Sequence, residues 1–328
     1  MSDHDRADSP DATAISRRDL FLGAGMTAGA VAAIGGLAWA PSAQAALSKS
    51  RQYFATTVAL ELDGISAGRV ASAEGGEPVI VPATPVAGVE KTATTTTLRY
   101  EPFVVRMGDM SPALYDWIGK STIGAASARG VNVITTDSVG KEIYRLAMQN
   151  VRLTEVQLDS LDATKTDAAR FTVKMAPGLS AHQFGGKGTA SAISTQKTSP
   201  ILRSNFRLFI QGLEAATTRA RSVDAVGLQI AANGALVPMA LRFSVPFADA
   251  SLLFSWMQET LAGKGSLRQG ELQLLTRDLT KVASSVSFSQ LMITRISCPA
   301  EAASGSIQHA EVECVPTGVT FNMGDLLK

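Results

Sequence analysis

The sequence predicts a mainly β protein made of two tandem β-barrel or β-sandwich domains, each with one flanking helix. The chain has 328 residues, which is too many for one ordinary core. Apolar residues in several segments alternate with polar ones, as they do in half-buried strands. A helical pattern with aromatic residues also returns later in the chain at a fixed spacing. Hydrophobic residues make up 45% of the chain, which is enough apolar surface for two cores.

The strand predictions rest on alternation with a period of two residues. Apolar side chains alternate in this way over residues 58–62, 131–135 and 171–175. The second of these runs ends at residues 137–140, where Asp, Ser and Gly favour a turn. A strand-rich unit of this size closes as a barrel or a sandwich, and its helix covers one edge or face.

One clear helix is predicted between these strands. Ser111 is a good N-cap residue, and Pro112 suits the first helical position. Leu114, Trp117 and Ile118 then follow at the spacing of one apolar helix face.

The pattern of this helix recurs 139 residues later. Residues 114–118 read Leu-Tyr-Asp-Trp-Ile, and residues 253–257 read Leu-Phe-Ser-Trp-Met. Leu-Arg-aromatic triplets at 98–100 and 241–243 precede the two helices, so we pair them as counterparts. The offset of 139 also carries Val173, Met175 and Pro177 onto Val312, Cys314 and Pro316, and the strand Phe54–Gly64 resembles Phe206–Gly212. We therefore predict a duplication of a unit of roughly 125 residues.

Two segments lack periodicity and set the domain boundaries. Residues 180–204 are rich in Gly, Ser and Thr and are predicted to be a linker. Residues 78–97 contain three prolines and are predicted to be a long irregular or edge segment. The expected domains are residues 46–179 and 205–328.

The start of the chain is predicted to be an export signal. Arg17 and Arg18 are followed by apolar residues, which is the pattern of the twin-arginine route. A moderately hydrophobic stretch rich in Gly and Ala follows over residues 20–40. Such a stretch could instead anchor the chain, because about 20 residues can span a bilayer.

A cleavage pattern favours a removable signal over an anchor. Ala43 and Ala45 give the small-x-small motif of a signal-peptide cleavage site. Residues 1–45 are therefore predicted to be removed, and the mature chain is predicted to be periplasmic or extracellular without a stable membrane anchor.

Charge and composition give little support to several classes of partner. The formal net charge of +1 offers no electrostatic reason to expect nucleic acid. The chain contains three histidines, a low number for a metal or acid–base enzyme. No Gly-x-Ser-x-Gly nucleophile motif and no His-Glu-x-x-His metal motif occurs.

The remaining candidates for chemistry have simpler explanations. Residues 119–121 read Gly-Lys-Ser but end a helix, whereas a phosphate-binding loop begins one. His182 lies in the predicted linker, and His309 lies at the start of a strand; both are expected to be solvated. A cluster of carboxylates is expected to be a solvated loop and comprises Asp159, Asp162 and Asp167. We predict no catalytic residue, no cofactor and no metal site.

The cysteines and the aromatic helix residues leave alternatives open. Simple hairpin pairing places Cys314 opposite a residue near 292, so a buried free thiol is favoured over a disulfide with Cys298. An oxidising compartment would still allow the disulfide. Trp117 and Trp256 could form a binding platform with their aromatic neighbours, but their helical spacing favours core packing.

In order and spacing, the first half resembles the tail tube family of contractile phage tails, whose fold is shared with the haemolysin-coregulated tube protein of type VI secretion. The segments that carry this resemblance are Phe54–Gly64, Leu98–Tyr100, Leu114–Trp117, Val131–Thr135, Val151–Leu158 and Ala168–Lys174. The second half resembles the family more weakly, because it has Gln211-Gly212 in place of Asp-Gly and lacks a Gly at the turn near Asp278.

The resemblance implies a small β-barrel with a flanking helix that assembles into rings, and rings that stack into a tube. It implies no active site. The tandem arrangement and the export signal depart from the family, and six barrels in a ring would need only three chains. The expected function is therefore an exported, self-assembling structural protein; the alternatives are a monomeric periplasmic protein that binds a ligand or polysaccharide, and an exported enzyme.

Overall fold

The computed structural model describes residues 57–82, 96–108, 110–123, 127–137, 140–184, 200–231, 234–298 and 307–324. The predicted signal, with Arg17, Arg18, Ala43 and Ala45, lies outside these residues. Most of the described residues are in strands, which confirms the mainly β fold class. We call residues 57–184 the first half and residues 205–324 the second half.

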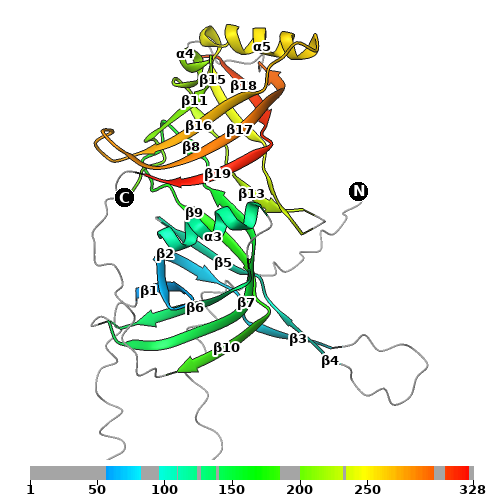
Figure 1. Ribbon diagram of the computed structural model, residues 1–328. Helices are drawn as coiled ribbons and strands as arrows, with labels where there is room; N and C mark the ends of the chain where they lie inside the picture. Colours follow the sequence, from blue (N-terminus) through cyan, green and yellow to red (C-terminus); the bar gives the residue numbers. More distant parts are fainter. Residues whose placement is uncertain are drawn as a thin grey trace, which may run out of the picture. The chain divides into compact units, whose positions relative to one another are not determined.

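The strands of the first half close into a barrel (Figure 1). Each strand pairs with the next in the order β7-β6-β1-β2-β5-β9, and β9 pairs again with β7. The bounds are β1 (Thr57–Leu62), β2 (Ile65–Glu74), β5 (Phe103–Met107), β6 (Arg129–Thr136), β7 (Glu142–Leu158) and β9 (Phe171–Ala176). The apolar residues predicted on one face of the first strand, Leu60 and Leu62, are buried in the barrel.

Strand β10 (Leu179–Phe184) continues along the edge of β7 that β9 occupies. Leu179 lies opposite Gln149, and Phe184 lies opposite Tyr144. The first residues of the predicted linker 180–204 are therefore paired strand, and residues 185–199 lie outside the described residues.

The predicted helix of the first half is α3 (Pro112–Thr122). The Ser111 hydroxyl accepts from the Leu114 amide at 3.4 Å, as an N-cap residue should. Leu114 and Trp117 are buried, and the Trp117 indole Nε1 donates to the Ser127 carbonyl at 3.2 Å. The two tryptophans are thus core residues, because Trp256 is also buried.

The second half repeats this order of elements. Its sheet runs β11-β16-β17-β18-β15, and β19 pairs with β17 as β10 pairs with β7. The bounds are β11 (Phe206–Ile210), β15 (Leu241–Pro246), η1 (Phe247–Asp249), α5 (Ser251–Leu261), β16 (Arg268–Leu275), β17 (Val282–Ser297), β18 (His309–Val315) and β19 (Gly318–Met323).

The equivalence extends to single residues. The Trp256 indole Nε1 donates to the Ser266 carbonyl at 3.0 Å, ten residues downstream, as Trp117 does to Ser127. The long strands β7 and β17 each contain one residue with a left-handed backbone, Asn150 at φ 53° and Gln290 at φ 51°.

The second half differs from the first where β2 would close the barrel. After β11 the chain forms the short helix α4 (Glu214–Thr217), which contacts both β11 and β15. It then forms β12 (Ser222–Val223), which pairs with β15 on one side and with β8 (Leu161–Asp162) of the first half on the other. The described strands of the second half therefore form an open sheet.

The prediction that the two Leu-Arg-aromatic triplets occupy corresponding positions is wrong. Leu98–Tyr100 lies in β4 (Thr96–Tyr100), whereas Leu241–Phe243 begins β15. Leu241 lies opposite Cys314 as Phe103 lies opposite Met175, so Phe103 is its true counterpart.

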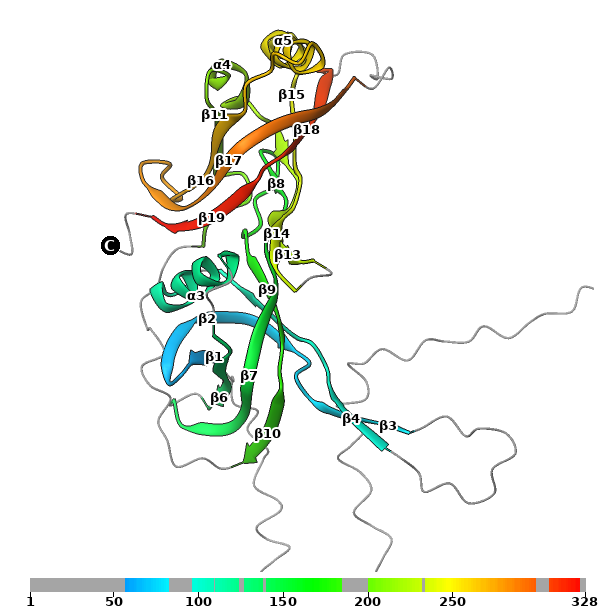
Figure 2. The same cartoon turned by 45° about the vertical axis from the view of Figure 1, so that its right-hand side comes forward.

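A hairpin precedes β5 in the first half and β15 in the second. Strand β3 (Pro78–Pro82) pairs with β4 in a separate two-stranded sheet, which Figure 2 shows extending away from the barrel strands. Strand β13 (Val226–Ile230) pairs with β14 (Leu236–Pro238). The predicted irregular segment 78–97 is thus paired strand at both ends, and residues 83–95 lie outside the described residues.

We expect Trp117→Phe and Trp256→Phe to lower the free energy of unfolding by similar amounts, about 1–2 kcal/mol each, because each removes one indole hydrogen bond to a backbone carbonyl. Urea unfolding followed by circular dichroism measures both values. Glu259→Ala on the exposed side of α5 is the control and should change stability by less than about 0.5 kcal/mol. If one substitution lowered the free energy of unfolding strongly and the other did not, the two helices would not be equivalent.

Candidate functional site

Of the residues singled out for phosphate or metal chemistry, three have side-chain partners, and the backbone amide of Asp159 donates to the Arg170 carbonyl. Residues 119–121 form the last turn of α3, where Lys120 pairs with Asp116 at 2.7 Å. Asp162 accepts from the Thr164 hydroxyl and amide, which lowers the pKa of its carboxyl group. Asp167 pairs with Arg203 at 3.2 Å. In the described part of the chain, no three His, Cys, Asp or Glu residues are placed to hold a metal ion.

The structure places His182 differently from the sequence prediction. It lies in β10, not in a linker, and its Nδ1 shares a hydrogen bond of 2.7 Å with the Tyr144 hydroxyl. Phe184 stacks at a tilt on the same tyrosine, with ring centroids 5.2 Å apart. His309 begins β18 as expected and lies opposite Pro246.

Both cysteines are free thiols. Cys314 lies opposite Ile293, close to the predicted position, and burial raises the pKa of its thiol to about 12. Cys298 follows β17 and is exposed.

A buried ion cluster in the first barrel was not predicted from the sequence. The Arg145 guanidinium contacts both carboxylate oxygens of Glu142, at 2.9 and 2.7 Å, and one oxygen of Glu61 at 3.1 Å. The arginine holds the pKa of the Glu142 carboxyl below its ordinary value, and the two carboxylates raise the pKa of the guanidinium. Both glutamates are buried, so each relies on this one cation.

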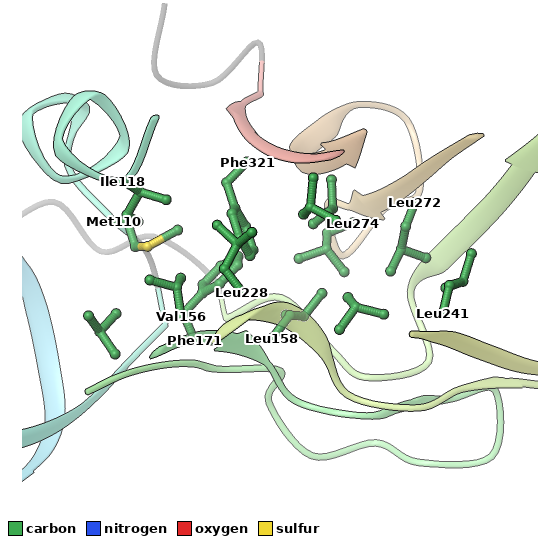
Figure 3. Packing of buried hydrophobic residues seen from close by; sticks show 14 of the residues in the cluster. Met110, Ile118, Val156, Leu158, Phe171, Leu228, Leu241, Leu272, Leu274 and Phe321 are labelled. Atoms are coloured by element: carbon green, nitrogen blue, oxygen red, sulfur yellow. The ribbon is translucent and has the colours of Figure 1, made fainter. Parts of the chain in front are cut away.

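Apolar residues of both halves meet at the junction between them (Figure 3). Helix α3 contacts β19, and the Tyr115 hydroxyl shares a hydrogen bond of 2.9 Å with the Ser284 hydroxyl. Phe171 of β9 meets Phe321 of β19 edge to face, with centroids 6.1 Å apart. These contacts join the two halves through one continuous apolar cluster.

Strand pairing strengthens the junction. Val226–Gln229 of β13 lie opposite Leu158–Glu155 of β7, so the second half adds a hairpin to the sheet of the first. A Cβ atom on Gly227 would lie 2.0 Å from the Val156 carbonyl oxygen, so only glycine allows this approach. The junction thus combines apolar contact with backbone pairing.

The described residues include no helix long and apolar enough to cross a membrane. No family model matches the sequence, and no curated protein matches it either.

Solved structures match parts of the chain at low similarity. Hcp1 from Flavobacterium johnsoniae is 11% identical with a TM-score of 0.30, over 39% of this chain and 96% of that chain. A chain of the PVC sheath–tube complex, from an extracellular contractile injection system, is 14% identical with a TM-score of 0.32, over 45% and 100%. A chain of the anti-feeding prophage cap, which terminates the tube, is 17% identical with a TM-score of 0.28, over 42% and 99%.

We expect Arg145→Met to cost about 3–5 kcal/mol of stability at pH 7, because it leaves two buried carboxylates without their cation. The Glu142 pKa is lowered in the folded state, so its ion pair contributes fully above the ordinary glutamate pKa of about 4.3. That contribution is lost as the pH falls through the lowered pKa. The stability gap between wild type and variant should therefore narrow on acidification.

Urea midpoints at pH 7 and at about pH 3 measure this gap. Lys174→Met is the control, since it breaks a more exposed pair with Glu155 and should cost under about 1 kcal/mol. A gap that does not change with pH would contradict the role of Arg145.

Proposed function

We propose that the chain is an exported, non-enzymatic structural protein that assembles with copies of itself into rings, tubes or filaments. Its unit is one β domain present in two tandem copies. The proposal rests on the junction, where the two halves of one chain contact each other through different faces. Three chains would supply six such domains to a ring.

The equivalent hydrogen bonds and backbone conformations support the duplication. Trp117 and Trp256 make the same contact to a carbonyl ten residues on, and Asn150 and Gln290 occur at the same point of β7 and β17. The helices α3 and α5 and the strands β10 and β19 have matching lengths and begin 139 residues apart.

The asymmetry of the junction supports assembly. Helix α3 of the first half contacts β19 of the second half. The corresponding elements, α5 of the second half and β10 of the first, do not make this contact within the chain. A contact between unlike faces is heterologous, and its repetition gives closed rings or open filaments.

Export by the twin-arginine route fits this function. That route is expected to carry a folded chain, so the two halves would cross the membrane already joined and associate with other copies afterwards. The proposed function requires no cofactor, nucleic acid or membrane anchor.

We expect the purified chain from Ala46 onward to form particles larger than a monomer at micromolar concentration. Light scattering measures their mass, and negative-stain electron microscopy measures their shape and symmetry. Rings or tubes would support the proposal, and threefold repetition would support the ring of three chains. A monomer over a wide range of salt would reject it and favour the monomeric binding protein.

We expect Arg17→Lys combined with Arg18→Lys to retain the chain in the cytoplasm, because the paired arginines are the residues that the export machinery recognises. Immunoblots of cell fractions measure its distribution. Arg6→Lys is the control and should leave export unchanged. Normal export of the double variant would reject the twin-arginine route without bearing on assembly.

A further inference from the structure

We propose that copies of the chain join through two specific surfaces that repeat the junction between the halves. The aromatic cluster of the first half comprises Tyr144, His182 and Phe184. The α5 stripe of the second half comprises Phe254, Met257 and Leu261. The aromatic cluster of one copy packs against the α5 stripe of the next, an inference that rests on the proposed self-assembly.

The junction within the chain provides the template. Tyr115, Ile118 and Thr122 form one stripe of α3, at spacings of three and four residues. Tyr115 is 7% exposed and Ile118 is 1% exposed. Tyr115 reaches Ser284 of β17, and Ile118 lies in the cluster that contains Phe321 of β19 (Figure 3). The second half thus covers Tyr115 and Ile118 of this stripe, and Thr122 at its end is half-buried.

The strand pairings identify the counterparts of the covering residues. Ser284 lies opposite Met323 in the pairing of β17 with β19. Tyr144 lies opposite Phe184 in the pairing of β7 with β10. The aromatic cluster therefore occupies in the first half the place that Ser284, Phe321 and Met323 occupy in the second.

The helix offset identifies the counterpart of the covered stripe. The stripe of α3 corresponds to Phe254, Met257 and Leu261 of α5. Phe254 and Met257 are only half-buried, and Leu261 is 76% exposed. Helix α5 packs on β17 and on η1, where Phe254 meets Phe247 edge to face. The stripe that the second half covers on α3 is thus only partly covered on α5.

The two surfaces match in chemistry. Phe184 is 81% exposed, which is unusual for a phenylalanine in a folded strand. The Tyr144 hydroxyl and His182 Nδ1 share a hydrogen bond, so an apolar partner leaves these two atoms paired. The α5 stripe carries no charged side chain. Contact between these surfaces buries aromatic and aliphatic groups without burying a charge.

The hairpin contact is not expected to recur between copies. In the hairpin of the first half, Pro78 lies opposite Tyr100, and in that of the second half Leu228 lies opposite Pro238. Pro78 therefore corresponds to Leu228. The residue before it, Glu77, corresponds to Gly227. A side chain at the position of Gly227 would meet the facing backbone, and proline has no N–H to donate. The contact between copies therefore rests on the helix stripe and the aromatic cluster.

Two variants test the contact one surface at a time. Phe184→Asp alters the aromatic cluster, and Leu261→Asp alters the α5 stripe; both positions are largely exposed, so neither change should affect folding. Each should raise the dissociation constant of the assembly at least about tenfold, as expected when a buried apolar side chain is lost. Ile123→Asp is the matched control, because Ile123 is 77% exposed at the end of α3 and belongs to neither surface. Its dissociation constant should stay within about twofold.

Mixing the two variants gives the sharper test. The Phe184→Asp chain keeps an intact α5 stripe, and the Leu261→Asp chain keeps an intact aromatic cluster. Sedimentation velocity should show dimers in the mixture at a concentration where each variant alone is monomeric, with no larger species. Thermal unfolding of each variant checks that its fold is retained.

The outcomes separate this inference from the proposed function. If the wild type assembles and both variants assemble equally well, this contact is overturned while self-assembly stands. If both variants are folded monomers and their mixture forms no dimer, the pairing of one surface with the other is overturned. If the wild type is a monomer, the proposed function and this inference fail together.

Discussion

The structure depends on one constraint: helix α3 must be covered both by its own barrel and by the second half. It contacts β2 and β7 of the first half, and β14 and β19 of the second half. Tyr115 and Ile118 are buried, and Ser284 of the second half is the hydrogen-bond partner of Tyr115. Burial of these residues therefore ties the two halves together.

The two halves share local features and differ elsewhere. Both have an indole hydrogen bond from the helix tryptophan to a backbone carbonyl, and both have a left-handed residue in the long strand. The second half has no full counterpart of β2; α4 contacts both β11 and β15, and β12 pairs with β8 of the first half. A barrel that is packed against a neighbour can be left open on that side, because the neighbour supplies the missing edge.

The sequence predicted the features that depend on local pattern. The spacing of Leu114, Trp117 and Ile118 identified the helix, and the offset of 139 residues identified its counterpart. The sequence prediction was wrong where the same residue types recur in strands that pair differently, as at Leu98–Tyr100 and Leu241–Phe243. The Glu61–Arg145–Glu142 cluster and strand β10 could not be predicted, because they depend on pairings between distant segments and not on a periodic pattern.

The covalent connection between the halves gives their junction a property that a contact between separate chains lacks. The two surfaces are held at a high effective concentration, so dilution does not separate them. The partly exposed stripe of α5 has no such tether, so its burial by a second copy would depend on the amount of protein present. The same kind of surface is thus buried permanently in one half and left partly exposed in the other.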